Sequence, residues 1–219
     1  MKIVEEKELN KSRDEIVSMA YGVCKSALFP VDESDVYDHI YGDSNLTTRF
    51  LLNKSNEIVG FGVVQNYDID IEDVSLAFSY LQGMVIAKKY QGYGYSKEML
   101  SRLYECFQSE LFGLRTQNPK MASALLNLFP NILNRVPIKD GDYIYNAKEL
   151  LDLIRLLPPY EMMNDNGIVK NCYQNQLYPN LEELKSVNNN INLDATDALA
   201  VVVQPKKILS KKFKKCKEC

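Results

Sequence analysis

The chain has 219 residues, of which 46% are hydrophobic and 25% charged, with 10 glycines and 8 prolines. These values are typical of a globular domain and exclude collagen, coiled coils and wholesale disorder. No stretch approaches the roughly 20 apolar residues of a membrane-spanning helix, and the first eight residues are too acidic for a secretory signal. We therefore expect a soluble, cytoplasmic protein with no membrane partner.

The charge is distributed unevenly along the chain. Residues 206–219 contain seven lysines and one glutamate, which gives them a net charge of +6. The whole chain carries −3, so residues 1–205 carry −9. An acidic body disfavours nucleic acid, because binding to it depends on neutralising phosphates, and favours a cationic partner. The five cysteines are odd in number and irregularly spaced, which predicts reduced thiols.

The N-terminal part predicts a strand, two helices and a hairpin. A short strand is expected at 2–4, and a helix begins after Ser12, because Glu15 three residues later completes a capping box. Apolar residues at helical spacing follow, and Phe29-Pro30 ends this helix. Residues 31–48 predict a short helix and a loop. Strands at 49–52 and 58–65 are expected to form a hairpin.

The middle of the chain continues with alternating elements. An acidic link at 68–73 leads to a long strand at 74–87, and an amphipathic helix begins near Gly94. A strand at 111–115 and a helix at 119–129 follow. This order predicts an α/β domain built in layers.

The C-terminal part predicts fewer elements. A helix is expected at 147–157 and a strand at 168–173, and the Asn-rich residues 185–197 predict a loop. Residues 198–203 predict a buried strand. We expect one domain over residues 1–205, with an insertion at about 140–195 before the last strand, and a basic tail at 206–219.

The segment from Met84 to Leu100 carries the chemistry. A strand runs into a turn with Gly92 and Gly94, and the turn opens directly onto a helix. Such a junction presents unpaired backbone N–H groups and the positive end of the helix dipole to an anion. Glycines let the main chain approach a phosphate closely. The turn lacks the third glycine or alanine of a dinucleotide-binding fingerprint, since position 97 is Lys.

The run Gln-Gly-Tyr-Gly-Tyr-Ser at 91–96 resembles the Gln/Arg-x-x-Gly-x-Gly/Ala signature of the GNAT family of N-acetyltransferases, with Ser96 at its last position. Residues 114–119 also resemble the fifth strand and the Asn-led fourth helix of that family. The resemblance extends over about residues 1–130, and the last strand returns near 198–204. It implies the GNAT fold, an α/β fold whose mixed central sheet has splayed fourth and fifth strands flanked by helices.

The resemblance implies an acyl-CoA-dependent N-acyltransferase that transfers acetyl from acetyl-CoA to a primary amine by direct attack. Main-chain groups would bind the pyrophosphate and the pantetheine arm and polarise the thioester carbonyl. No metal and no cysteine nucleophile is implied. The implied cofactor-binding residues are Met84, Val85, Ile86, Gln91, Gly92, Tyr93, Gly94, Tyr95, Ser96 and Asn118.

The general acid is the clearest departure from the family. Many members place a tyrosine about two turns into the fourth helix, whereas Leu125 falls at about that position here. Tyr160 or Tyr173 could replace it, or the reaction could need no dedicated acid.

The general base is not singled out by spacing. Ser79 and Tyr80 on the expected fourth strand are candidates, as are Glu72 and Asp73 at its start. His39, the only histidine, is expected in a loop near the acceptor, without a catalytic role.

The acceptor is expected to be a cationic small amine, such as a polyamine or an aminoglycoside-like compound, or a lysine side chain. Residues 140–195 would form one wall of its site. Residues 68–73 either line the entrance or form a solvated loop. The pair Cys216 and Cys219 lacks the further ligands of a zinc site.

Two alternatives differ in class. The protein could bind acyl-CoA without turnover, as the missing tyrosine would allow. It could also modify a macromolecule recruited through the basic tail at 206–219. The sequence leaves the acyl chain length and the oligomeric state open, a homodimer included.

Overall fold

The computed structural model describes residues 1–27, 31–71, 74–107, 109, 111–116, 118–128, 155, 157, 168–169 and 198–203. These residues fall into two compact units, which are described separately. Residues 1–67 and 79–108 belong to the first unit, and residues 68–78 and those from 109 to 203 belong to the second. Within the described residues, no helix is both long and apolar enough to cross a membrane.

The first unit contains most of the described helices and strands. They are β1 (Lys2–Val4), the 3-10 helix η1 (Glu6–Glu8), α1 (Arg13–Ser26), α2 (Glu33–Tyr41), β2 (Leu46–Leu52), β3 (Ile58–Ile71), β4 (Val74–Ile86), the 3-10 helix η2 (Lys88–Tyr90) and α3 (Tyr95–Phe107). Residues 68–78, which end β3 and begin β4, are assigned to the second unit.

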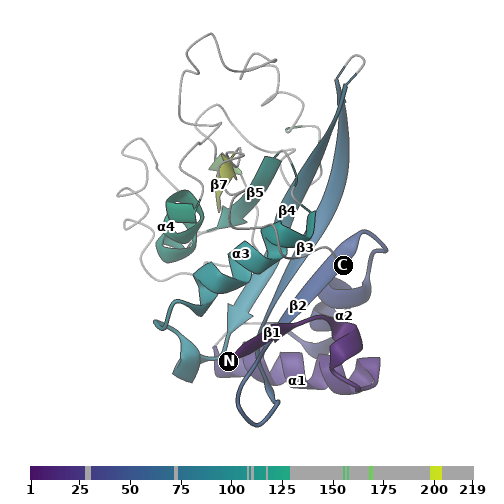
Figure 1. Cartoon of the computed structure of the whole chain (residues 1–219), viewed down its shortest axis with the longest axis vertical. Coiled ribbons are helices and arrows are strands. Elements are labelled where there is room, and N and C mark those ends of the chain that lie inside the picture. The colour runs from purple at the N-terminus through teal and green to yellow at the C-terminus, as the bar shows by residue number, and fades with distance from the viewer. Residues whose placement is uncertain are drawn as a thin grey trace. The chain divides into compact units, whose positions relative to one another are not determined.

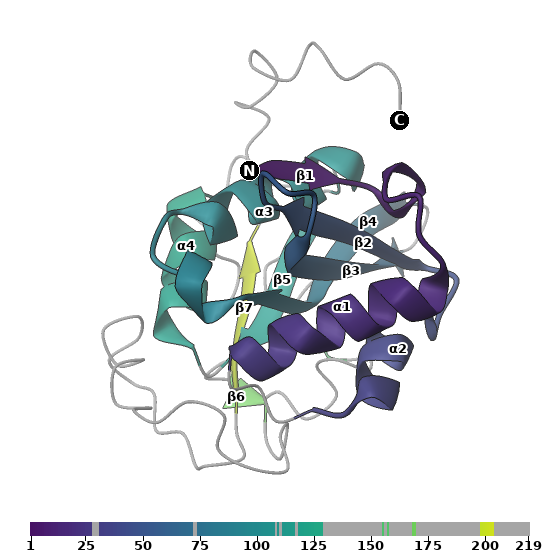
Figure 2. The same ribbon diagram turned by 90° about the horizontal axis from the view of Figure 1, so that it is seen from below.

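The strands of the first unit follow the order β1-β2-β3-β4 (Figure 1). β1 pairs antiparallel with β2, and β2 pairs antiparallel with β3, so that Phe50 lies between Val4 and Phe61. Near the end of β4, the Ala87 N–H donates to the Val59 carbonyl over 2.9 Å. Helices α1 and α2 cover one face of these strands and α3 covers the other (Figure 2).

Both helices on the first face begin with a reciprocal cap. The Ser12 hydroxyl accepts from the Glu15 N–H while the Glu15 carboxylate accepts from the Ser12 N–H, and Asp32 and Asp35 make the same exchange at the start of α2. The capping box at Ser12 is therefore confirmed. The buried faces of both helices form a core with β2 and β3 that includes Ile16, Ala20, Val23, Val36, Ile40, Phe50, Phe61 and Val63. Each large side chain buried here contributes about 1.5–3 kcal/mol.

On the opposite face, α3 lies very close to β3 at a glycine. A Cβ on Gly62 would be 2.8 Å from Leu103 Cδ1 and 3.2 Å from Met99 Cγ. Met99 and Leu103 are both fully buried. The absence of a side chain at Gly62 therefore sets how closely α3 can pack.

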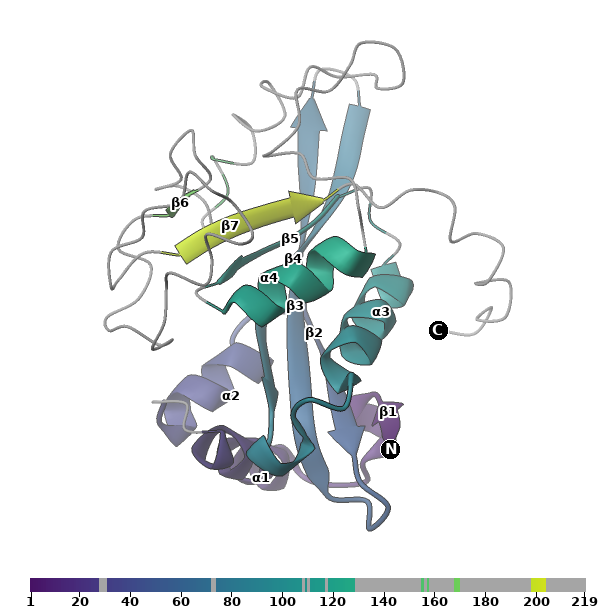
Figure 3. The same cartoon turned by 90° about the vertical axis from the view of Figure 1, so that its left-hand side faces the viewer.

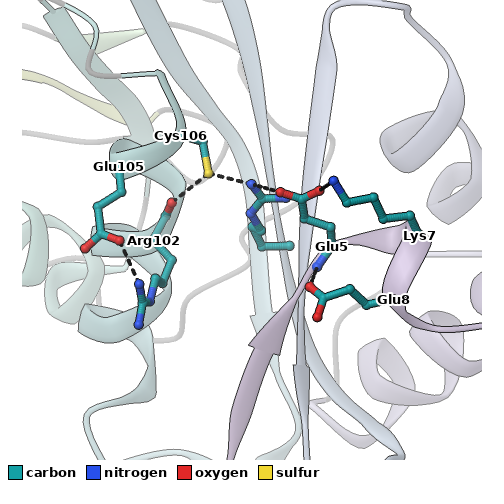
Figure 4. A network of polar contacts seen from close by, with 7 residues as sticks. Glu5, Lys7, Glu8, Arg102, Glu105 and Cys106 are labelled. Atoms are coloured by element: carbon teal, nitrogen blue, oxygen red, sulfur yellow. Dashed lines mark hydrogen bonds and ion pairs between the residues drawn. The ribbon is translucent and has the colours of Figure 1, made fainter. Parts of the chain in front are cut away.

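A polar network links the segment after β1 to β2 and α3 (Figure 4). Glu5 Oε1 is 2.7 Å from Arg49 Nη2, and Glu5 Oε2 is 2.9 Å from Lys7 Nζ. The Arg49 side chain is only 10% exposed, and its guanidinium also donates to Cys106 Sγ. The Cys106 thiol donates to the Arg102 carbonyl. The hydrogen bond from Lys7 and the guanidinium of Arg49 hold the pKa of Glu5 below its usual range.

The second unit contains β5 (Leu111–Thr116), α4 (Pro119–Leu128), β6 (Ile168–Val169) and β7 (Ala198–Val203). Its strand order is β5-β7-β6, with antiparallel pairing on both sides of β7. α4 packs against β5, beside which β7 runs (Figure 3). The strand predicted at 198–203 is therefore confirmed, with Ala200 and Val202 buried, and it pairs with β5.

Several predicted boundaries need correction. β3 continues to Ile71, so the acidic segment expected to be a link from residue 68 is a strand up to that residue. β2 begins at Leu46, three residues before its predicted start. Arg155 lies in a turn and Leu157 in a bend, so the predicted helix at 147–157 does not reach its predicted end. The predictions for 28–30, 72–73, 129–154, 170–173, 185–197 and 206–219 lie outside the described residues, and the single domain over residues 1–205 stays a prediction.

Replacing Gly62 with valine is expected to destabilise the first unit. The new Cβ would overlap the buried Leu103 methyl group, and overpacking of this kind costs about 1–3 kcal/mol. The matched control is Gly22→Ala in the exposed face of α1, where a Cβ meets nothing within 4 Å. It should stabilise by about 0.5–1 kcal/mol. Urea unfolding measures both, and a Gly62→Val chain as stable as the native chain would contradict the packing.

Replacing Glu5 with glutamine is expected to leave the buried Arg49 without its carboxylate, at a cost of about 1–3 kcal/mol near neutral pH. The pKa of Glu5 is lowered from 4.5 by folding, so its contribution is complete above that value and is lost as the pH falls through the lowered pKa. The difference in unfolding free energy between the native chain and Glu5→Gln should therefore narrow in acid.

The control for this pair is Glu105→Gln. Glu105 pairs with an Arg102 side chain that is half exposed, and exposed pairs contribute less than about 1 kcal/mol. An equal loss of unfolding free energy in the two variants at neutral pH would show that the Glu5–Arg49 pair stabilises the fold no more than an exposed pair does.

Candidate functional site

The turn between β4 and α3 has an unusual backbone. Gly92 and Gly94 have φ values of 85° and 83°, a region that side chains with a Cβ rarely adopt. At both glycines, a Cβ would meet nothing within 4 Å. Tyr90 N–H donates to the Ala87 carbonyl over 2.8 Å, which closes η2 just before the turn. The two glycines therefore reverse the chain and leave open space beside it.

The N–H groups of this turn point to an anion site. The Gln91 N–H donates to the Lys88 carbonyl, and the first helical bonds come from the N–H groups of Lys97 and Glu98 to the Gly94 carbonyl. Between them, the five N–H groups of residues 92–96 find no acceptor among the described residues. Five unpaired donors at the start of a 13-residue helix, with the positive end of its dipole, favour a negatively charged ligand.

The side chain of Gln91 fastens this turn to β4. Its Nε2 donates to the Ile86 carbonyl over 2.8 Å. The bond joins two of the segments predicted to bind the cofactor, residues 84–86 and 91–96. The Ile86 carbonyl therefore has a partner, and the backbone N–H of Gln91 separately has the Lys88 carbonyl. The donors that remain available are those of Gly92, Tyr93, Gly94, Tyr95 and Ser96.

The side chains of β4 alternate between two faces of the sheet. Met84 faces α3, since its Cγ is 3.6 Å from the Cβ position of Gly62. Val85 packs against the core formed with α1 and α2. Gln82 lies two residues before Met84 and so on the same face, and its buried Oε1 has no donor among the described residues. An unpaired buried acceptor is costly, so this oxygen is suited to a donor from a ligand.

Asn118 belongs to the second unit and begins α4. Its N–H donates to Thr116 Oγ1 over 2.9 Å, and its Oδ1 accepts from the N–H groups of Lys120 and Met121. The side-chain oxygen therefore caps α4. A role of Asn118 towards a cofactor stays a prediction. Leu125, which stands where many family members have a tyrosine, is fully buried in α4.

The catalytic candidates named from sequence lie in different settings. Ser79 is buried on β4, and its hydroxyl donates to Asn66 Oδ1 on β3 over 2.8 Å. Tyr80 is buried on β4. Tyr160, Tyr173, Glu72 and Asp73 lie outside the described residues. The Ser79 hydroxyl thus forms a hydrogen bond between β4 and β3. A catalytic role for any of these residues stays a prediction.

His39 lies on α2, not in the loop that the sequence predicted. Its side chain is exposed, and its Nδ1 is 3.0 Å from the Asp35 carbonyl oxygen. The capping pair of Asp32 and Asp35 stabilises the start of α2, and the helix then runs through a segment whose polar residues suggested a loop. In the part of the chain that the structure describes, no three or more His, Cys, Asp and Glu side chains form a group that could hold a metal ion.

Comparison with known proteins gives the same fold. The model of the acetyltransferase (GNAT) family matches residues 15–124. The structure of Chaetomium thermophilum Naa20 in complex with a bisubstrate analogue is similar over 99% of this chain and 93% of that chain, at 10% identity and a TM-score of 0.54. No curated protein matches the chain.

Two further structures match smaller shares. A GNAT family acetyltransferase from Staphylococcus aureus is similar over 49% of this chain and 76% of that chain, at 14% identity and a TM-score of 0.37. The aminoglycoside 6'-N-acetyltransferase from Enterococcus faecium is similar over 53% of this chain and 61% of that chain, at 11% identity and a TM-score of 0.41.

The matched residues 15–124 make up half of the chain and include the turn between β4 and α3. The fold predicted from the sequence, an α/β fold with a mixed sheet and flanking helices, is confirmed by the likeness to the Naa20 structure. The chain belongs to the GNAT family of acetyltransferases.

Proposed function

We propose that the protein transfers an acetyl group from acetyl-CoA to a primary amine that is positively charged in solution. The observation that carries this proposal is the row of five N–H groups at residues 92–96, at the start of α3, that have no acceptor in the described part of the chain. Coenzyme A carries a pyrophosphate, and several N–H donors at a helix start suit such a group.

The residues present fit a pyrophosphate. Gly92 and Gly94 leave open space on the side where a Cβ would project, so phosphate oxygens can reach the main chain. Ser96, where the family signature has glycine or alanine, is small and half-buried. Lys88, Lys89 and Lys97 are exposed near the turn and add positive charge.

The pantetheine arm has a fitting partner on β4. Gln82 Oε1 is a buried acceptor without a donor among the described residues, and the arm of coenzyme A carries amide N–H groups. Gln82 shares the α3 face of β4 with Met84, and α3 begins at the proposed pyrophosphate site. When bound, the co-substrate would supply a thioester whose carbonyl carbon an amine attacks.

The described cysteines support direct transfer without an acyl-enzyme. Burial raises the pKa of the Cys24 thiol to about 11, which makes it a poor nucleophile. The Cys106 thiol is bonded to Arg102 and Arg49 at the far end of α3 from the glycine turn. A direct attack needs the amine in its neutral form, so a proton must leave it before or during the reaction.

The charge of α2 supports a cationic acceptor. Residues 26–48 contain no lysine and no arginine but five exposed acidic residues, namely Asp32, Glu33, Asp35, Asp38 and Asp43. Asp32 and Asp35 are used as helix caps, whereas Glu33 and Asp38 have no ion pair among the described residues. The Arg13 guanidinium lies over the Tyr41 ring at the end of α2, so the surface has an excess of negative charge and not a single sign. Such an excess raises the local concentration of a cationic substrate.

The pyrophosphate site is tested by calorimetry with acetyl-CoA on the native chain and on Gly94→Trp. The indole would occupy the open space beside the turn. Loss of two charge-assisted hydrogen bonds costs about 3 kcal/mol, so we expect binding about 100-fold weaker. Lys54→Trp, in the exposed turn between β2 and β3, is the control for a bulky surface residue and should bind normally.

A melting curve must show that Gly94→Trp still folds, because its φ of 83° strains any side chain there. No heat from the native chain with acetyl-CoA or longer acyl-CoAs would reject the proposed function. Binding without transfer to any of a panel of amines would instead support a module that only binds acyl-CoA.

The acceptor class is tested by reversing charge on α2. In Glu33→Lys/Asp38→Lys, kcat/KM for polyamines and other cationic amines should fall by about tenfold in dilute buffer, and the difference should shrink at high salt because screening removes it. Transfer to an uncharged aniline should change little. An equal fall for both acceptors, or one that salt does not affect, would contradict electrostatic recruitment.

A further inference from the structure

His39 presents one free ring nitrogen. Its Nδ1 lies 3.0 Å from the Asp35 carbonyl oxygen, and a carbonyl only accepts, so Nδ1 carries a proton in this bond. In the neutral ring, Nε2 then has a lone pair. Nε2 has no partner among the described residues, and the side chain is exposed. The bond to Asp35 thus leaves Nε2 as the ring nitrogen that would accept a proton.

The same ring edge lies against β4 at a glycine. His39 Cδ2 is 3.7 Å from the position of a Cβ on Gly83. Cδ2 is bonded to Nε2 in the ring, so Nε2 is one bond from the atom that lies against β4, although it is itself more than 4 Å from that Cβ position. Because Gly83 has no side chain, a gap about as wide as one methyl group separates its Cα from this part of the ring. Gly83 directly precedes Met84, where the segment expected to hold the thioester begins.

The imidazole and α3 are on opposite faces of β4. Gly83 and Val85 share one face, and Val85 packs against the core made with α1 and α2. Met84 is on the other face, near the position of Gly62 and close to α3. Figure 2 shows the same division, with α2 and α3 on opposite sides of the strands. An amine at His39 would therefore reach β4 from the face opposite the helix that begins at the proposed pyrophosphate site.

We infer that His39 is the general base of the transfer reaction, acting on an amine bound between α2 and Gly83. This inference rests on the proposed function. The ammonium form of the acceptor gives one proton to Nε2 of His39, and the exposed ring passes it to solvent. The neutral nitrogen attacks the thioester carbonyl carbon, so that a C–N bond forms and the C–S bond breaks. The sulfur leaves as a thiolate and takes up the second proton lost by the nitrogen.

The acidic surface of α2 and this base belong to one helix. Glu33 and Asp38 lie within six residues of His39 in the sequence, and all three are exposed. The carboxylates would attract the ammonium ion, and the imidazole would then remove its proton. A cationic acceptor needs the second step, because an ammonium ion has no lone pair with which to attack.

The first test is steady-state acetyl transfer with native enzyme, His39→Ala and the control Tyr37→Ala on the same helix. General base catalysis contributes about 10²–10⁴-fold, so kcat of His39→Ala should fall by at least about 100-fold, while acetyl-CoA binding by calorimetry stays unchanged. Added imidazole should restore part of the lost rate. Tyr37→Ala, which changes another exposed side chain of α2, should keep the native kcat.

The second test fills the space beside the ring. In Gly83→Ala the new Cβ would make an ordinary contact with His39, whereas the longer side chain of Gly83→Leu would extend past the Cβ position and push against the ring and an amine bound beside it. We expect Gly83→Leu to raise KM for the amine by tenfold or more without changing acetyl-CoA binding, and Gly83→Ala to have a smaller effect.

The outcomes separate the two proposals. If the native chain binds acetyl-CoA and transfers acetyl, but His39→Ala retains its kcat, the assignment of His39 is wrong and the proposed function stands. A fall in kcat that imidazole does not restore, together with weaker acetyl-CoA binding, would also overturn it. No transfer by the native chain to any amine would overturn both proposals.

Discussion

The turn from β4 into α3 is the constraint on which the site depends. The chain must end a strand and start a helix within a few residues, and only left-handed glycines at 92 and 94 allow that path. A helix cannot satisfy its first N–H groups internally, and together with the N–H groups of the preceding turn, five donors find no acceptor among the described residues. The bond from Gln91 to the Ile86 carbonyl fixes these donors relative to the end of β4. The geometry that makes the turn possible is also the geometry that suits a pyrophosphate.

A second glycine position determines where that helix lies. With no side chain at Gly62, α3 packs directly on β3 through Met99 and Leu103. The opposite face is covered by α1 and α2 through a large apolar core. In the proposals above, the two faces of the sheet serve two reactants, the co-substrate at the start of α3 and the amine at His39 on α2. Gly62 on β3 lets α3 approach the main chain, and Gly83 on β4 does the same for the His39 ring of α2.

Local patterns in the sequence predicted many of these elements. They did not predict the contacts between segments that are distant in the sequence. The cap at Ser12 and the glycine turn before α3 are encoded by neighbouring residues, so both predictions are confirmed. The predicted end of β3 was too early, because the charged residues Asp68 and Asp70 indicated a loop. In the structure they alternate along the strand with Ile69, which is buried. No local pattern could show that His39 lies against Gly83, or that the Ser79 hydroxyl is bonded to Asn66.

The most direct test of the central claim is to follow the backbone amides by NMR during titration with coenzyme A. The account predicts that the N–H resonances of residues 92–96 show the largest shifts, since these groups donate to the pyrophosphate. The N–H of Gln91, which is bonded to the Lys88 carbonyl, should shift less. Binding with no change at residues 92–96 would contradict the account, as would larger shifts elsewhere in the chain.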